Sequence, residues 1–553
     1  MESKWWQKTV VYQIYPRSFK DSTGNGIGDI NGIIEKLDYL EDLGIETIWV
    51  SPFFESPQQD YGYDVSNFRQ IDPSYGSMND FDKLLKEIHD RDMNIVLDLV
   101  LNHTSIKHPW FIESASSKDN PKRDWYIWHD GKKPGGQKPP NNWKALPGGP
   151  AWLYYENTDQ WVYFHFLPFQ PDLNYRNPEV KEEMFDTIRF WLNKGVDGFR
   201  LDILHSIYED ESLRDNPFTW RLYSEKKLAY YFQHHKYDLN LPETFNFTLE
   251  IRRILDEYEP TRFLIGEVFG SIEDLRKYYG SNNNGLHMVF LFEFTSIAPK
   301  FKPKKITKVI SGYEKAFPFP YTPTFVYGNH DRDRYISLLG NNVQKAKILA
   351  TMQLTLRGVP YIYYGEEIGM ANVKLKLKAS KDPIGRKFTK FPYPQLVKIL
   401  GIFVSRDVCR TPMQWNGKHN AGFTPNKNIK PWLKVSKNYE NVNVEKEEKD
   451  PGSILNCYKR LLKVRKENLT LQTGEFEFIN LEKLNKKCLA YRRTHNKQVV
   501  YIYLNFSDKE ILSKTPKQEP NLIFSTYLNR KALDPKEYNG NLKLTPYEGI
   551  IFK

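Results

Sequence analysis

The stretch Val196-Asp197-Gly198-Phe199-Arg200-Leu201-Asp202-Ile203 decides the fold, because it predicts a buried β-strand that ends on a carboxylate. Gly198 permits close backbone approach in such a strand. Residues two apart face the same side, so Arg200 and Asp202 share a face. An Asp beside an Arg has a lowered pKa and stays ionised at neutral pH, as a carboxylate nucleophile requires. A purely structural Arg–Asp pair fits this stretch equally well, and the rest of the chain decides between the two.

Eight apolar runs, this one included, are expected to form strands. They cover residues 10–16, 47–50, 94–100, 196–203, 262–268, 285–294, 324–329 and 359–364. Helical spacing of apolar residues is found between them, over 30–43, 81–91 and 180–194. Strands and helices in alternation predict parallel pairing with right-handed crossovers. The expected fold is therefore an α/β (β/α)8 TIM barrel.

Two stretches interrupt the alternation. Residues 104–174 are rich in Pro, Gly and Trp, and about 70 residues are too many for one structureless loop in a compact protein, so they predict a subdomain inserted after the third strand. A long excursion follows the eighth strand, over about 370–450. The barrel is thus expected over 1–103 and 175–467, and short alternating runs over 468–553 predict a C-terminal antiparallel β-domain.

Charge and cysteine content exclude several classes of protein. The net charge of +11 is spread along the chain without a block of like charges, which favours a solvated surface over a nucleic-acid arm. The three Cys form no CxxC motif and no disulfide framework is expected. No signal segment or membrane span is evident. We expect a cytoplasmic monomer or weak homo-oligomer, with no nucleic-acid or membrane partner.

Polar residues follow the carboxyl ends of five of the expected strands, which is where chemistry takes place in such barrels. They are Asp60, Tyr63 and Asp64 after the second strand, Asp98, Asn102 and His103 on the third, Arg200 and Asp202 on the fourth, Glu267 on the fifth, and Asn329, His330 and Asp331 on the seventh. A single acid at a strand end is often only a helix cap. Five consistent strand ends predict a catalytic site.

Three carboxylates without a Cys nucleophile, a Gly-x-Ser-x-Gly motif or a His-Glu-x-x-His motif indicate glycoside chemistry. One carboxylate would be the nucleophile and another the general acid/base. The apolar surroundings of Glu267 predict a raised pKa, and the neighbouring arginine biases Asp202 the other way. Asp331 is then free to bind sugar hydroxyls, helped by His103 and His330. A metal held by the histidines is less favoured, because no Glu-x-x-His pair occurs.

The loop 21–29 has the spacing of a calcium loop. Oxygen-bearing side chains alternate along it, from Asp21 through Thr23 and Asn25 to Asp29, and glycines bend it. It lacks the closing Glu of an EF-hand, and two of the four side chains carry no charge. A calcium site and a plain turn both remain open.

These motifs resemble those of the α-amylase superfamily, glycoside hydrolase family thirteen, over nearly the whole chain. Asp98-Leu-Val-Leu-Asn102-His103 is similar to the first family motif, Gly198-Phe-Arg200-Leu-Asp202 to the second, Gly266-Glu267-Val to the third and Asn329-His330-Asp331 to the fourth. The stretches 170–174, 365–370 and 410–415 are similar to the oligo-1,6-glucosidase subfamily.

The resemblance implies a retaining, exo-acting α-glucosidase that hydrolyses short oligosaccharides through a covalent glucosyl-Asp intermediate. Asp202 would be the nucleophile, Glu267 the acid/base and Asp331 the transition-state stabiliser. The implied subsite for the non-reducing glucose consists of Asp60, Tyr63, His103, Arg200, His330 and Arg410. The implied structural Ca²⁺ site consists of Asp21, Thr23, Asn25, the carbonyl of Ile27, and Asp29. No organic cofactor is expected.

Ile203, directly after the expected nucleophile, bears on specificity. In the resembled subfamily a Val there accompanies α-1,6 bonds, and a small or hydroxyl residue accompanies α-1,4 bonds. Ile is branched and apolar like Val, which favours isomaltose-type substrates, although one methyl group discriminates by only about 1–3 kcal/mol. Trehalose-6-phosphate hydrolase, α-1,4-glucosidase, sucrose-active enzyme and transglucosylase remain alternatives.

Overall fold

The computed structural model describes residues 4–132, 138–390, 404–479, 484–515, 521–530, 532 and 541–553. Residues 391–403 of the expected 370–450 excursion lie outside these ranges. None of the helices described has the length and apolar character needed to cross a bilayer. The chain separates into two compact units: a first unit of Met1–Ile48, Glu87–Met93 and Leu291–Lys553, and a second unit of Trp49–Lys86 and Asn94–Phe290.

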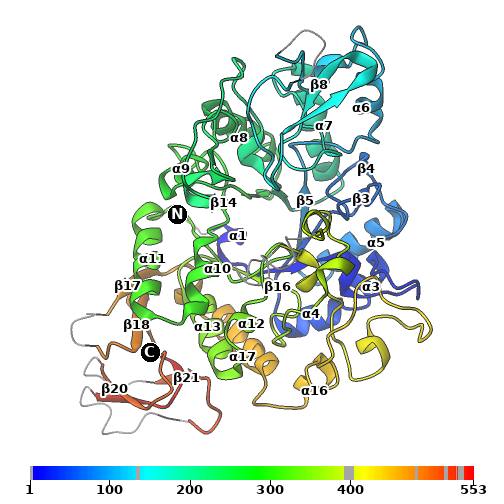
Figure 1. Ribbon diagram of the computed structural model, residues 1–553. Helices are drawn as coiled ribbons and strands as arrows, with labels where there is room; N and C mark the ends of the chain where they lie inside the picture. Colours follow the sequence, from blue (N-terminus) through cyan, green and yellow to red (C-terminus); the bar gives the residue numbers. More distant parts are fainter. Residues whose placement is uncertain are drawn as a thin grey trace. The chain divides into compact units, whose positions relative to one another are not determined.

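Eight parallel strands form one sheet with the order β14-β13-β9-β5-β2-β1-β16-β15 (Figure 1). Their bounds are Val11–Ile14 for β1, Thr47–Val50 for β2, Asn94–Leu99 for β5, Gly198–Leu201 for β9, Phe263–Gly266 for β13, Met288–Val289 for β14, Thr324–Val326 for β15 and Val359–Tyr363 for β16. Each strand lies inside one of the eight expected runs. The prediction of a (β/α)8 barrel is confirmed.

In the second unit, β9 lies between β5 and β13. Its register places Arg200 beside Asp98 on one side and beside Ile265 on the other. Gly198 is required for this close pairing, because a Cβ there would lie 2.4 Å from the carbonyl oxygen of Phe263. The last residue of β9 pairs with the last residue of β13, so the residues that follow, on either strand, leave the sheet side by side.

Three helices cover these strands: α5 (Met78–His89), α7 (Pro178–Asn193) and α8 (Pro242–Leu255). Helix α7 begins with Pro at its first position, and the Asn177 side chain caps it by accepting the N–H of Glu179. Its buried face carries Trp191, whose ring stacks on Phe54 with centroids 5.1 Å apart and whose Nε1 donates to the carbonyl of Phe68. These contacts hold α7 against the segment that follows β2.

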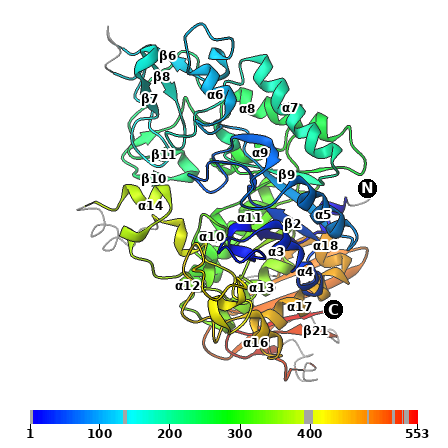
Figure 2. The ribbon, with the colours of Figure 1, turned by 90° about the vertical axis from the view of Figure 1, so that its right-hand side faces the viewer.

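The stretch 104–174, predicted as an inserted subdomain, contains a three-stranded antiparallel sheet of order β6-β8-β7. The strands are Trp128–His129 (β6), Trp152–Tyr155 (β7) and Gln160–Tyr163 (β8), and Figure 2 shows them near α6 (Pro109–Ser114). Trp152 packs between Trp143 and Tyr163, at centroid distances of 6.3 and 5.3 Å. Aromatic packing therefore provides the core of this sheet.

A second small sheet follows β9 and was not predicted. It consists of β10 (Tyr223–Ser224), β11 (Ala229–Tyr230) and β12 (Gln233–His234), all antiparallel. Strands of two residues are too short to show the alternation of apolar and polar residues that marks a strand in a sequence. The segment that leaves the end of β9 therefore has more structure than its pattern indicates.

The first unit contains the C-terminal domain, a five-stranded antiparallel sheet of order β17-β18-β19-β23-β21. The strands are Glu475–Phe478 (β17), Cys488–His495 (β18), Gln498–Asn505 (β19), Leu522–Ser525 (β21) and Gly549–Phe552 (β23). Arg493 anchors it to the barrel: its Nη1 donates to the carbonyls of Thr355 at 2.7 Å and Leu471 at 2.8 Å. Separately, β20 (Ile511–Lys514) pairs with β22 (Asn541–Leu544).

The helices of the first unit surround its part of the barrel sheet. They are α1 (Trp5–Lys8), α2 (Pro16–Phe19), α3 (Ile30–Ile34), α4 (Leu37–Leu43), α10 (Glu293–Ile297), α11 (Pro303–Ala316), α12 (Tyr335–Leu338), α13 (Val343–Thr355), α14 (Pro383–Lys387), α16 (Val444–Glu448), α17 (Ile454–Lys466) and α18 (Leu469–Thr473). Figures 1 and 2 both show α13 beside α17. The single helix expected over 30–43 is two helices, because Lys36 departs from helical geometry with φ −117° and ψ 8°.

A buried carboxyl, that of Glu366, follows β16, and we expect it to make stability depend on pH. Glu366 accepts a hydrogen bond from the Tyr458 hydroxyl at 3.0 Å, and burial raises the pKa of Glu366 to about 8. A carboxyl whose pKa is raised on folding stabilises the protein fully below its unfolded pKa of about 4.3. That contribution is lost as the pH rises through about 8.

We expect the Glu366→Gln variant to lose this dependence, because an amide of the same shape stays neutral. The urea midpoint of the wild-type protein should fall more steeply between pH 5 and pH 8 than that of the variant. Glu467→Gln is the matched control, since Glu467 is exposed, and it should follow the wild type. Parallel curves for Glu366→Gln and wild type would contradict the expectation.

Candidate active site

The buried guanidinium of Arg200 contacts three carboxylates at the carboxyl ends of β5, β9 and β13. Arg200 Nη1 lies 2.6 Å from Asp98 Oδ1 and 2.6 Å from Asp202 Oδ1. Its Nη2 lies 2.6 Å from Glu267 Oε2. Arg200 is fully buried, and Asp202 and Glu267 are each 6% exposed. Four residues expected at the site from three separate stretches of sequence are therefore in direct contact.

The contact with Glu267 differs from what the sequence indicates. We expected Arg200 to act on Asp202 alone, because the two share a face of one strand. In the structure the same guanidinium also pairs with Glu267. The guanidinium favours the ionised form of both carboxylates. The expected difference in pKa between Asp202 and Glu267 therefore needs another cause, and it stays a prediction.

Tyr63 contacts Asp98 through its hydroxyl and His103 through its backbone carbonyl. Asp98 Oδ2 accepts hydrogen bonds from the Tyr63 hydroxyl at 3.0 Å and from Trp49 Nε1 at 3.3 Å. Burial raises the pKa of Asp98 to about 6, against the opposing pull of Arg200. Burial also lowers the pKa of His103 to about 3, so its ring is neutral near pH 7. Nε2 of this ring donates to the backbone carbonyl of Tyr63 at 3.2 Å.

Asp60 lies in the connection between two short antiparallel strands, β3 (Phe54–Glu55) and β4 (Asn67–Ile71). Its backbone N–H donates to Asp64 Oδ1 at 2.9 Å, and its Oδ2 accepts from Gln170 Nε2 at 3.4 Å. Gly62 has a φ of +108°, and a Cβ there would lie 2.6 Å from the carbonyl oxygen of Pro52. Burial raises the pKa of Asp64 to about 6. This connection thus holds Asp60 fully buried beside the first residue of the 170–174 stretch.

Ile203, the expected specificity residue, has a left-handed backbone with φ +31° and ψ 41°. This conformation is an outlier for a β-branched residue and costs about 1–3 kcal/mol. Two contacts maintain it: Ser206 Oγ donates to the carbonyl of Ile203 at 2.8 Å, and the N–H of Leu204 donates to the carbonyl of Glu267 at 3.1 Å. The chain after Asp202 is therefore turned back onto the end of β13.

A second cluster, in the first unit, surrounds Asp331. Its Oδ1 accepts from Arg410 Nη2 at 2.7 Å and from Arg406 Nη1 at 3.4 Å, and its Oδ2 lies 3.0 Å from His330 Nε2. Burial alone would raise the pKa of Asp331, but His330, Arg410 and Arg406 outweigh it and hold this pKa well below its usual range. The Asp331 side chain is 30% exposed, so it is an ionised carboxylate that a ligand can reach.

Three residues of this cluster were missed in the sequence. Arg406 pairs with both Asp331 and Asp382, the latter at 2.8 Å. The ring of Tyr15 stacks on His330 with centroids 5.8 Å apart, and Gln13 Nε2 lies 2.7 Å from His330 Nδ1. Gln13 could have been found from the sequence, because it is a lone polar residue in an apolar strand. Arg406 begins a short 3₁₀ helix, Arg406–Val408, and nothing in the sequence around it indicated a role at the site.

The loop 21–29 is closed by its own hydrogen bonds. Asp21 accepts the N–H groups of Gly24 and Gly26, each at 2.7 Å. Asp29 accepts the N–H groups of Ser22 at 2.8 Å and Gly32 at 2.6 Å. Over the described ranges, no three His, Cys, Asp or Glu side chains are grouped as a metal cluster requires. The oxygen-rich donor set suits Ca²⁺, and the carboxylates of Asp21 and Asp29 also accept backbone N–H groups, so the metal site stays a prediction.

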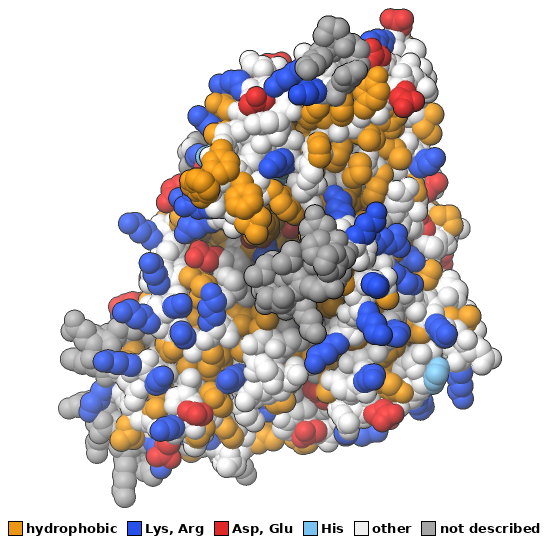
Figure 3. Space-filling view, in the orientation of Figure 1, with side chains coloured by type: hydrophobic (Ala, Val, Ile, Leu, Met, Phe, Trp, Pro, Cys, Tyr) orange, Lys and Arg blue, Asp and Glu red, His pale blue; other side chains and the backbone are white. Residues whose placement is uncertain are grey.

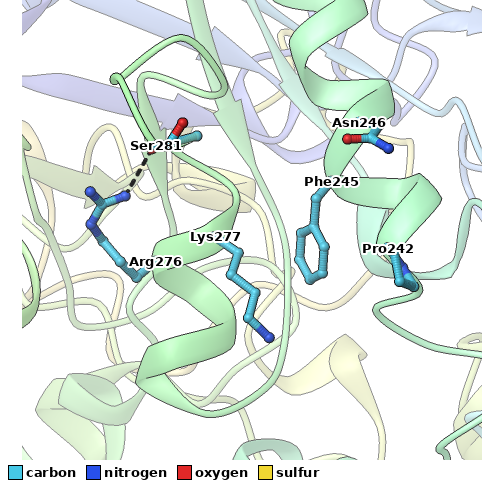
Figure 4. Close-up of a pocket in the computed structure, with 7 residues that line it drawn as sticks. Pro242, Phe245, Asn246, Arg276, Lys277 and Ser281 are labelled. Atoms are coloured by element: carbon cyan, nitrogen blue, oxygen red, sulfur yellow. Dashed lines mark hydrogen bonds between the residues drawn. The ribbon is translucent and has the colours of Figure 1, made fainter.

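A surface recess in the second unit lies outside the expected site. It has a volume of about 460 Å³ and lies between α8 and α9 (Ile272–Lys277), as Figure 4 shows. Its cations are already engaged: Lys277 Nζ pairs with Asp274 at 2.9 Å, and Arg276 Nη1 donates to the carbonyl of Gly280 at 3.1 Å. None of the residues expected to be catalytic lines this recess.

Comparisons with known proteins identify the family of this chain. The family model for the α-amylase catalytic domain matches residues 13–474. A probable α-glucosidase of Rhizobium meliloti is 40% identical over 93% of this chain and 91% of its own length. The oligo-1,6-glucosidase of Bacillus cereus is 38% identical over 100% of both chains. The solved trehalose-6-phosphate hydrolase of Bacillus licheniformis has a TM-score of 0.86 and 35% identity, covering 100% of this chain and 99% of its own.

The family model spans most of the chain, and both sequence relatives align over nearly their whole lengths. Those relatives are an α-glucosidase and an oligo-1,6-glucosidase, which cleave glycosidic bonds. The chain therefore belongs to the α-amylase family of glycoside hydrolases, in its α-glucosidase and oligo-1,6-glucosidase subfamily.

Proposed function

We propose that the protein is a retaining, exo-acting α-glucosidase that releases terminal α-linked glucose from short oligosaccharides. The observation that carries this proposal is the single guanidinium of Arg200, which contacts both Asp202 and Glu267 at 2.6 Å. Two carboxylates held on one cation lie at the carboxyl ends of neighbouring strands, where such barrels perform their chemistry.

The spacing of these carboxylates favours retention of configuration. Neighbouring strands lie about 4.8 Å apart, and Asp202 and Glu267 each follow directly on the last paired residues of β9 and β13. Retaining glycosidases hold their carboxyl groups about 5–5.5 Å apart, whereas inverting enzymes leave about 6.5–9.5 Å for a water molecule. The register agrees with the closer pair.

In the mechanism we propose, Asp202 attacks the anomeric carbon while Glu267 protonates the departing glycosidic oxygen. The bond to the leaving sugar breaks and a glucosyl ester of Asp202 forms. Once the ester has formed, Asp202 no longer carries a charge beside Glu267, which favours ionised Glu267 as the base for the incoming water. Water then displaces Asp202, and α-glucose is released. Asp331 stabilises the positive charge that develops on the sugar.

The glucose subsite that we propose is the one implied by the family motifs. Its members are Asp60, Tyr63, His103, Arg200, His330 and Arg410. The oligosaccharide is the only partner we propose. Lys and Arg side chains are spread over the face in Figure 3 among uncharged ones, which is unlike a nucleic-acid-binding surface. The cysteines Cys409, Cys457 and Cys488 are free and buried, which agrees with a reducing, cytoplasmic setting.

The nucleophile is tested by Asp202→Asn. We expect kcat/KM on p-nitrophenyl α-glucoside to fall by more than about 1,000-fold, because an amide cannot form the ester. Asp197→Asn is the matched control, since this buried Asp of the same stretch pairs with Arg262 instead. Polarimetry or NMR on the wild type should show α-glucose first. Full activity of Asp202→Asn, or β-glucose as the first product, would reject the mechanism.

Linkage preference is tested at Ile203. We propose a preference for isomaltose-type α-1,6 bonds and expect Ile203→Val to keep it. Ile203→Thr is equally branched at Cβ, so it meets the same backbone conformation, but it adds a hydroxyl. It should shift the ratio of kcat/KM for isomaltose over maltose by about 10-fold towards maltose. An unchanged ratio would remove Ile203 as the determinant.

Trehalose-6-phosphate hydrolysis is the second candidate. The similarity to a solved trehalose-6-phosphate hydrolase and the net charge of +11 favour it. A panel of isomaltose, maltose, sucrose, trehalose and trehalose-6-phosphate separates the two. Glucose release from the phosphorylated sugar alone would replace the isomaltose proposal, and products longer than the substrate would identify a transglucosylase.

We also propose that Ca²⁺ binds at Asp21, Thr23, Asn25, the carbonyl of Ile27, and Asp29. After treatment with EDTA, added Ca²⁺ should raise the melting temperature, because an ion that binds only the folded state stabilises it. The increase should vanish in Asp21→Asn and persist in Asp119→Asn, an exposed control. A wild-type melting temperature that does not respond to Ca²⁺ would show that the loop is a plain turn.

A further inference from the structure

Gln13 is a polar residue in the otherwise apolar strand β1. It is 2% exposed, and a buried primary amide costs free energy unless its groups are paired. Its Nε2 lies 2.7 Å from Nδ1 of His330. The amide is therefore directed at a ring that itself contacts Asp331, which is more than core packing requires.

His330 is held on its other sides by groups of the same cluster. Its Nε2 lies 3.0 Å from Asp331 Oδ2. Its backbone carbonyl accepts from Arg410 Nε at 2.7 Å, and its ring stacks on Tyr15. An ionised carboxylate only accepts hydrogen bonds, so the contact with Asp331 favours a proton on Nε2. These contacts do not determine whether Nδ1 carries a proton as well.

The contact with Gln13 bears on the other ring nitrogen, Nδ1. An amide nitrogen only donates hydrogen bonds, so Nδ1 of His330 must accept. The single N–H of a neutral imidazole then resides on Nε2 and donates to Asp331 Oδ2. In other proteins, too, the partner of one histidine nitrogen sets the protonation of the other.

We propose that Gln13 is a positioning residue that holds His330 in its Nε2–H tautomer and so holds the Asp331 carboxylate in one orientation. The kinetic consequence rests on the proposed glucosidase function, whereas the tautomer does not depend on any substrate. Without the amide donor, a neutral His330 can carry its proton on Nδ1. The lone pair of Nε2 would then face the Asp331 carboxylate, and one of its donors would be lost.

The tautomer is measured on the protein labelled with [15N]histidine. The signals of His330 are identified by their absence in His330→Gln. We expect an unprotonated nitrogen at Nδ1 and a protonated one at Nε2. A proton on Nδ1 of the resting wild-type protein would overturn the proposal, whatever the enzyme hydrolyses.

The kinetic test uses Gln13→Met, which keeps the volume but removes the donor. We expect kcat/KM on p-nitrophenyl α-glucoside to fall by about 10- to 100-fold, the range found when the second partner of a metal-bound histidine is removed. The matched control is Gln353→Met, because Gln353 is buried in the same unit and donates only to the carbonyls of Phe325 and Tyr361. It should lower the melting temperature with near wild-type kcat/KM. Equal losses of kcat/KM in both variants would reduce Gln13 to a structural residue.

Gln13→Glu tests the proton directly. A carboxylate at this position accepts from Nδ1–H, so Nε2 carries a proton only in the imidazolium. The ratio of variant to wild-type kcat/KM should therefore rise as the pH falls from 8 to 5. A ratio that is constant over this range would contradict the proposal. If the wild type releases no glucose from the α-glucoside, the proposed function fails while the NMR result still decides the tautomer.

Discussion

The ion pairs of Arg200 constrain how the strands of the second unit pair with one another. One fully buried cation contacts three carboxylates, each at 2.6 Å. Burying charges costs several kcal/mol per ion unless they are paired with good geometry. Strands β5, β9 and β13 must therefore stay in register, and Gly198 makes their close approach feasible. The negative charge in excess over the one guanidinium is complementary to the positive charge of an oxocarbenium-like transition state.

The parts of the structure that were predictable are those governed by local periodicity. Each barrel strand is a short apolar run between turn signals, and each was found where its run stands. Parallel strands present their carboxyl ends on the same edge of the sheet, which is why Asp98, Asp202 and Glu267 could be expected to meet. Arg200 and Asp202 could be paired because residues two apart in a strand face the same way.

What could not be predicted depends on partners that are distant in sequence. Arg200 contacts Glu267 because β9 and β13 pair in a particular register. The sequence of either strand alone does not predict that register. Gln13 and His330 are more than 300 residues apart, so only the fold reveals their contact. The small sheet β10-β11-β12 has strands of two residues, which are below the length at which alternation can be read.

The left-handed backbone of Ile203 means that a substitution at this proposed specificity position also changes stability. At φ +31°, Gly, Asn or Asp would relieve strain that Ile incurs. Selection for stability alone would thus move this position towards small or polar residues, whereas this chain has a branched apolar side chain directly after Asp202. A directed-evolution library at this position will confound the two effects unless folding and substrate preference are scored separately for each variant.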